Sequence, residues 1–314
     1  MTQNPIIIDT PDNPLHQEWN EKEWIGVGKK YPVSGTVPAF IKAARSKVLA
    51  VAPIYSSYIP SQKMSITDLL KAQLPAQSSA LIMHTAAGAF SKEEPNEDMT
   101  WLKTRPIPPK EWLEELDKDF GQAWFNGARS IEDKRFKNSR LPLWTLSYWK
   151  EMRIAIEKWA MWQAADEWLA RWGKDGEMLE EADRAREMMS CLSWGLDITA
   201  LGAGCPKENF TVLLSDNWID NDTIDMMMFD LAARVRLDPE LRRTTLVAAL
   251  NLQMHIHRAY NTGNYSKESV PLLSRYTQLF KEKKRSHLYF PAHINGNHWV
   301  PFLINFKNET ICHG

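Results

Sequence analysis

Two apolar, aromatic-rich runs near the C-terminus predict a β-hairpin. The runs cover residues 287–294 and 298–306, and an Asn295-Gly296 step lies between them. An Asn-Gly step between such runs is the strongest short-range signal for a hairpin turn. In the second run every second residue from Val300 onwards is apolar, which is the period of a strand that buries one face. An imidazole at the start of this strand, such as that of His298, can reach a cleft at the edge of a sheet.

Apolar residues recur at helical spacing through the middle of the chain. A helix that opens at Pro109 or Lys110 is expected to end near Gly121. The strongest helical pattern begins after Pro142 and continues to about Trp172. A charged helix follows over about 177–192, and the short link between the last two predicts an αα-hairpin.

Tryptophans recur along the strongest of these helices, among them Trp149, Trp159, Trp162 and Trp172. A row of exposed aromatic rings can stack on bases or sugars. Tryptophan at helical spacing more often fills a core, and the basic residues between these rings are matched by nearby acids. The packed-core interpretation is therefore favoured, and nucleic acid binding is not indicated.

Residues 1 to about 60 carry frequent prolines, which indicates a loosely ordered region. Short strands are predicted at Ile6–Ile8 and Val48–Ala52. Ser65 followed by Asp68 is a variant of the capping box, so a short helix is expected to begin after Ser65.

A boundary is expected near residues 202–206, where small residues and a proline gather. A short strand is predicted at Phe210–Leu214, and a helix after Trp218 that ends before Pro239. The five acids between residues 216 and 230 suit a helix N-terminus. They lack the glycine and terminal glutamate of an EF-hand, so no calcium site is predicted.

Residues 244–257 fit either a strand or a helix. On a strand His255 and His257 would share one face, a spacing that some metal sites use. No third ligand is specified, so surface or core histidines are the favoured interpretation. A further helix is predicted over 266–280.

The composition is that of a soluble globular protein, with 314 residues of which 44% are hydrophobic and 25% charged. A net charge of -1 gives no field that suggests nucleic acid or a membrane surface. No apolar run approaches the length of a membrane span, and the N-terminus lacks the features of a signal peptide. An intracellular location, in the nucleus or cytoplasm, is therefore expected.

Cys191, Cys205 and Cys312 are an odd number of widely spaced cysteines. Their spacing predicts neither a disulfide framework nor a zinc site. No cofactor is indicated by the sequence.

The run from Leu288 to Trp299, followed by an apolar strand, resembles the central block of the Ulp1/SENP family. These are cysteine peptidases that cut ubiquitin-like proteins of the SUMO type after a Gly-Gly tail. In the family's block a His-Trp pair follows a proline and precedes the strand. The resemblance implies that His298 is the catalytic general base and that Trp299 lines the tunnel for the tail.

A second stretch, Trp218–Asp225, resembles the Trp-Leu-x-Asp-x-x-Ile-Asn sequence with which the family opens its catalytic domain. Asn221 stands at the position of the family's Asp. In the family two tryptophans sandwich the Gly-Gly tail, so the resemblance implies that Trp218 and Trp299 are substrate-binding residues.

The family mechanism also needs an Asp that orients the base, a Gln and a nucleophilic Cys. The resemblance places all of them beyond Gly314. We therefore expect a peptidase of this family with a shortened chain that does not cleave by itself. The alternatives are a non-catalytic pseudoprotease that keeps Trp218 and Trp299 to bind a ubiquitin-like tail, and a helical interaction protein that functions through residues 101–200.

The expected fold class is α+β. Residues 1–100 form an N-terminal region that the sequence defines poorly, and residues 101–200 form a helical region with the αα-hairpin. Residues 205–314 are expected to form a partial Ulp1-like protease domain. By the resemblance this domain is the first half of a papain-like fold with a small antiparallel sheet, and its partners are ubiquitin-like proteins or their conjugates.

Overall fold

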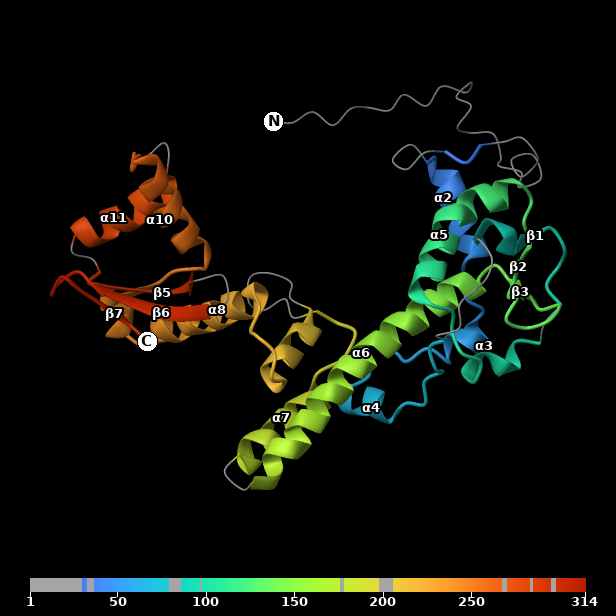
Figure 1. Ribbon diagram of the computed structural model, residues 1–314, viewed down its shortest axis with the longest axis horizontal. Helices are drawn as coiled ribbons and strands as arrows, with labels where there is room; N and C mark the ends of the chain where they lie inside the picture. The colour runs from blue at the N-terminus through green and yellow to red at the C-terminus, as the bar shows by residue number, and fades with distance from the viewer. Residues whose placement is uncertain are drawn as a thin grey trace. The chain divides into compact units, whose positions relative to one another are not determined.

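The computed structural model describes residues 30–32, 37–78, 86–96, 98–175, 178–197, 206–266, 270–282, 285–294 and 298–314. The chain divides into two compact units. Unit 1 holds Met1–Ser61 and Lys71–Ala160, and unit 2 holds Gln62–Leu70 and Met161–Gly314. Helices accompany two small sheets, which confirms the α+β class (Figure 1). None of the helices in the described ranges combines the length and apolar character that a membrane crossing needs.

Unit 1 is built around helix α5 (Lys110–Phe125) and the first part of α6 (Thr145–Trp172). Leu113, Leu116 and Phe120 recur at helical spacing on α5 and are buried. The other elements are α2 (Ala39–Val48), α3 (Pro53–Ser56), η2 (Ala86–Ala89), η3 (Met99–Lys103), β1 (Phe90–Ser91), β2 (Ser130–Glu132) and β3 (Arg140–Pro142). The strands form an antiparallel sheet in the order β1-β2-β3.

The strand predicted at Val48–Ala52 is wrong. Helix α2 continues to Val48. At its C-terminal end the Leu49 N–H donates to the Arg45 carbonyl at 3.0 Å. Pro53 then occupies the first turn of α3, a position that its fixed φ favours. This apolar run is a connection between two helices. The strand predicted at Ile6–Ile8 lies outside the described residues.

Helix α5 does not end near Gly121 as predicted, because it continues to Phe125. The ring of Tyr31 packs directly against this glycine. A Cβ atom at Gly121 would lie 2.7 Å from Tyr31 Cδ1, which is closer than van der Waals contact allows. The glycine therefore marks a close approach of an aromatic ring and not the end of the helix.

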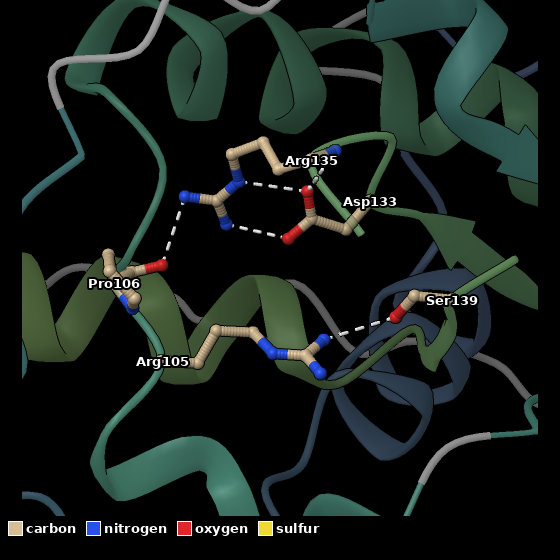
Figure 2. A network of polar contacts seen from close by, with 5 residues as sticks. All are labelled: Arg105, Pro106, Asp133, Arg135 and Ser139. Carbon is tan, nitrogen blue, oxygen red and sulfur yellow. Dashed lines mark hydrogen bonds and ion pairs between the residues drawn. The ribbon is translucent and has the colours of Figure 1, made fainter. Parts of the chain in front are cut away.

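A buried ion pair fixes the loop that joins β2 to β3 (Figure 2). Arg135 donates from Nε and Nη2 to the two carboxylate oxygens of Asp133, at 2.8 and 2.6 Å. Its Nη1 also donates to the Pro106 carbonyl at 2.9 Å. The Asp133 side chain is 1% exposed and that of Arg135 11% exposed, so this pair is shielded from water.

A second arginine continues the network. Arg105 donates to Ser139 Oγ at 3.2 Å, as Figure 2 shows. Its guanidinium carbon lies 3.2 Å from the ring centroid of Trp101 and 3.9 Å from that of Phe136. Because its planar head contacts an aromatic ring on two sides, Arg105 is held in place by stacking as well as hydrogen bonding.

Unit 2 begins with a helical hairpin. Helix α6 ends at Trp172, as predicted, and η4 (Gly173–Asp175) and α7 (Leu179–Cys191) follow. Arg186 on α7 donates to Asp166 on α6 at 3.0 Å, which confirms the αα-hairpin. Trp149 and Trp162 are buried, which confirms the packed-core interpretation for them. Trp159 is half-buried, and Trp172 is 47% exposed at the end of the helix, so the interpretation is wrong for Trp172.

The short helix predicted after Ser65 is α4 (Ile66–Lys71). Ser65 Oγ accepts from the Asp68 N–H at 3.0 Å and donates to Asp68 Oδ2 at 2.8 Å. This exchange confirms the predicted variant of the capping box.

The C-terminal part of unit 2 is a four-stranded sheet with helices on both faces (Figure 1). Its helices are η5 (Lys207–Leu214), α8 (Asn221–Leu237), α9 (Leu241–Thr244), α10 (Asn251–Thr262) and α11 (Pro271–Lys281). Its strands are β4 (Thr245–Val247), β5 (His287–Ile294), β6 (His298–Asn305) and β7 (Thr310–His313), in the order β4-β5-β6-β7. Helices α10 and α11 cover one face, and α8 lies on the other.

The predicted hairpin is confirmed as β5 and β6. Ile294 pairs with His298 next to the turn, and Phe290 pairs with Phe302 in the middle, where their rings stack at 5.5 Å. The sheet as a whole is mixed and not purely antiparallel as expected, because β4 is parallel to β5. One face carries Leu288, Phe290 and Ala292, which form a small core with the neighbouring helices.

The strand predicted at Phe210–Leu214 is wrong, because these residues belong to the 3-10 segment η5. Thr211 donates to the Glu208 carbonyl at 2.6 Å and Ser215 to the Val212 carbonyl at 2.8 Å. Such local bonds from hydroxyl side chains compete with strand pairing. The boundary expected at residues 202–206 falls mostly outside the described residues.

Candidate functional site

The rings of Trp218 and His298 contact each other in unit 2. Their centroids are 6.5 Å apart and their planes 84° apart, an edge-to-face arrangement. Trp218 is 71% exposed, and His298 is also exposed. Two predicted site residues that are far apart in the chain therefore lie side by side at the surface.

Trp299 projects from the opposite face of β6 to His298, because successive side chains of a strand alternate. Its indole Nε1 donates to the Ile219 carbonyl at 3.2 Å. Its ring also contacts the ring of its cross-strand neighbour His293, with centroids 4.6 Å apart. The third predicted residue thus joins the start of β6 to the backbone next to Trp218.

The segment that carries Trp218 is held on both sides. On one side Asp220 caps helix α8 by accepting from the Thr223 N–H at 2.8 Å, and Thr223 is fully buried. On the other side Asp216 accepts from Trp168 Nε1 at 2.9 Å. The backbone of Trp218 is therefore fixed while its ring remains exposed.

The end of β5 is held by a side-chain amide. The His293 N–H donates to Gln253 Oε1 at 2.6 Å, and Gln253 Nε2 donates back to the His293 carbonyl at 2.7 Å. Strand β4 has already ended at Val247, so the glutamine of α10 takes the place of a neighbouring strand. Its amide therefore extends the backbone pairing of β5 to His293, one residue before the strand ends at Ile294.

An exposed imidazole such as that of His298 can transfer protons near neutral pH. To activate a nucleophile it needs a thiol or hydroxyl within hydrogen-bonding reach. Cys312 lies on β7 and pairs with Leu303. At the usual rise per strand residue, Leu303 is about 16 Å along β6 from His298, so Cys312 is not placed to be its nucleophile. Cys205 lies outside the described residues.

The histidines considered for a metal do not share a face. His255 and His257 lie on helix α10, where two residues are separated by about 200° around the axis. His257 Nε2 is instead 2.8 Å from Asn261 Nδ2. No cluster of three or more His, Cys, Asp or Glu side chains that could hold a metal occurs in the described part of the chain.

Sequence reasoning missed His293, Gln253 and the Ile219 carbonyl as parts of this site. The hairpin register could have placed His293 opposite Trp299, since each lies equally far from the turn. The other two depend on how α10 and the segment before α8 pack on the sheet. Comparisons with protein-family models, with curated proteins and with solved structures found no match for this chain.

Proposed function

We propose that residues 206–314 bind the C-terminal tail of a SUMO-type ubiquitin-like protein, as part of an Ulp1-like cysteine peptidase domain. The observation that supports the proposal is the meeting of Trp218 and His298 at one surface, with Trp299 bonded to the residue after Trp218. The family resemblance assigns Trp218 and Trp299 to the tail site and His298 to the role of general base.

Aromatic rings suit a Gly-Gly tail because glycine has no side chain to hold the rings apart from the backbone. Trp218 contributes an exposed ring that a tail can cover. Burying an exposed indole against a peptide removes apolar surface from water and favours binding. Trp299 is half-buried and holds the backbone beside that ring.

His298 has the role of general base in this proposal. Hydrolysis by the family mechanism also needs an Asp, a Gln and a Cys, which the resemblance places after residue 314. Among the described residues no carboxylate or thiol is bonded to the His298 ring. Tail binding is therefore the part of the function that we assign to residues 206–314, and cleavage requires those further groups.

The test is a calorimetric titration of the full chain with a mature SUMO-type protein that ends in Gly-Gly. We expect binding that weakens at least about tenfold in Trp218→Ala, because an interface aromatic commonly contributes more than 1 kcal/mol. Trp172→Ala is the matched control, since Trp172 is also exposed, at 47%, but lies on helix α6.

A partner whose tail is changed to Ala-Ala should bind more weakly than the native one. Equal affinity for the two tails would contradict the proposed tail site. So would a wild-type chain that binds no mature ubiquitin-like protein.

A second candidate function is a helical interaction surface on the αα-hairpin. Met178, Leu179 and Met188 are 42%, 49% and 63% exposed on or next to α7, and Trp172 is exposed at the end of α6. Trp172, Met178 and Leu179 lie at the connected ends of α6 and α7, whereas Met188 lies about two and a half turns further along α7. Exposed apolar side chains that lie together mark protein contact sites. Leu179→Glu should abolish the capture of partners by the full chain if this end of the hairpin carries the function, and should leave tail binding unchanged.

A further inference from the structure

An apolar cavity lies beside strand β4 in unit 2. Its volume is about 380 Å³, and helix α8 contributes Met228, Phe229 and Val235 to its wall. The three residues of β4 and the two that follow it, residues 245–249, also line the cavity, and Tyr276 of α11 contributes from the opposite side of the sheet. Because helices from both faces of the sheet reach this cavity, it borders the outer edge of β4.

The backbone of β4 has free hydrogen-bonding groups on that edge. The Thr244 carbonyl accepts from Ser286 at 2.8 Å, and the Ala248 N–H donates to Tyr289 at 2.9 Å, so the even-numbered residues face β5. Backbone groups alternate along a strand, so the N–H and carbonyl of Val247 point away from β5. In the described residues neither group of Val247 has a hydrogen-bond partner, and β4 is the first strand of its sheet.

Positive charge surrounds this edge. Arg236, Arg242 and Arg285 line the cavity. The carboxylate that lines it, Asp225, accepts a hydrogen bond from the Leu250 N–H at 3.2 Å. The described residues of the wall therefore include three guanidinium groups and one carboxylate. This excess of positive charge favours an anionic occupant.

We propose that the β4 edge binds an extended acidic peptide segment of a partner protein by strand addition. The segment pairs with the N–H and carbonyl of Val247 and places an apolar side chain in the cavity. Its acidic side chains lie beside Arg236, Arg242 and Arg285. Free backbone groups, an apolar cavity and guanidinium groups meet at one strand, which are the three features that strand addition to an acidic segment uses. A small anionic amphiphile would use the cavity and the arginines but leave Val247 unpaired.

The test uses the full chain and fluorescence anisotropy of a labelled decapeptide. The peptide alternates valine and threonine and carries two glutamates at each end, and its control carries lysines in their place. We expect the acidic peptide to bind at least about tenfold more tightly than the lysine peptide, and its affinity to fall as salt is added.

Variants separate the two kinds of contact. Val247→Pro removes the outward N–H but no bond to β5, so it should abolish peptide binding while the circular dichroism spectrum is kept. Arg242→Glu should weaken binding at least about fivefold. Arg234→Glu is the matched control, because Arg234 is an exposed arginine of α8 that does not line the cavity and pairs with Asp230.

Unchanged affinity in Arg242→Glu would overturn the proposal, and so would equal binding of the two peptides. If decanoate binds in an arginine-dependent way and the peptide does not, the cavity is a small-ligand site and strand addition is wrong. None of these outcomes depends on Trp218, Trp299 or His298, so they leave the proposed tail site untouched.

Discussion

The indole Nε1 of Trp299 donates a hydrogen bond to the carbonyl oxygen of Ile219 at 3.2 Å, across 80 residues of sequence. The bond fastens the start of β6 to the backbone that carries Trp218. Trp218 itself is 71% exposed, and its ring meets the ring of His298 in an edge-to-face arrangement. The two tryptophans of the proposed site therefore differ in role, because one holds the backbone and the other presents its ring.

Trp299→Phe should lower the free energy of unfolding by about 1 kcal/mol, because the Ile219 carbonyl loses its donor. Urea denaturation followed by far-UV circular dichroism measures the loss. Trp218→Phe is the control and should change stability by less than about 0.5 kcal/mol, as is usual for an exposed side chain. Equal losses in the two variants would show that the hydrogen bond contributes nothing measurable.

Asp133→Ala should be strongly destabilising, by about 3 kcal/mol, because it leaves the nearly buried Arg135 without its carboxylate. Glu180→Ala breaks an ion pair with Arg184 whose side chains are both about 70% exposed, and should cost less than about 1 kcal/mol. Thermal unfolding of the two variants provides the comparison. A small loss in Asp133→Ala would mean that Arg135 finds another partner.

Burial raises the pKa of Tyr148 well above its ordinary value, with a smaller contribution from Tyr58. Above pH about 10 the unfolded chain loses this proton while the folded chain keeps it, so stability falls as the pH rises. Below that pH Tyr148 adds no pH dependence. Between pH about 9 and 11 its share of the loss should be about 1 kcal/mol.

Tyr148→Phe tests this assignment. The variant removes the hydroxyl that donates to the Leu102 carbonyl at 3.1 Å, so it should be less stable at neutral pH. Its stability should then fall less steeply than that of the wild type at alkaline pH. Urea midpoints measured across this range give the two slopes, and identical slopes would exclude Tyr148 as the titrating group.

Signals that act over a few residues were predictable from the sequence. Ser65 and Asp68 cap α4 as expected. The Asn-Gly step correctly predicted a hairpin, in which Ile294 pairs with His298. The convergence of Trp218 with His298 was expected only through the family resemblance. Residue patterns alone contain no distance between segments this far apart.

Features that depend on distant partners were not predictable in this way. Phe210–Leu214 has the composition of a strand but no neighbouring strand, so local hydroxyl bonds decide its structure. The spacing of His255 and His257 fits one face of a strand. The segment is instead helix α10, whose buried side carries Leu252 and Ala259. Within the part of the chain that the structure describes, strand β4 is an edge strand that pairs only with β5, in parallel, and no local pattern specifies that pairing.

Gly121→Ala should destabilise unit 1 even though alanine is the better helix former. Alanine at an ordinary helix interior position is favoured by about 1 kcal/mol over glycine. At Gly121 the new Cβ would stand 2.7 Å from Tyr31 Cδ1, and such overpacking costs about 1–3 kcal/mol. The ring is not free to retreat, because the Tyr31 N–H donates to Gln122 at 3.1 Å and the ring contacts Phe125 edge-on.

Removal of the ring should reverse the sign of this effect. In a Tyr31→Ala background the clash is absent, so Gly121→Ala should stabilise the chain by up to about 1 kcal/mol. The four unfolding free energies form a double-mutant cycle whose interaction energy reports the clash directly. If Gly121→Ala has the same effect in both backgrounds, Tyr31 does not restrict this position. A change from loss to gain would show that the glycine is there to admit the ring.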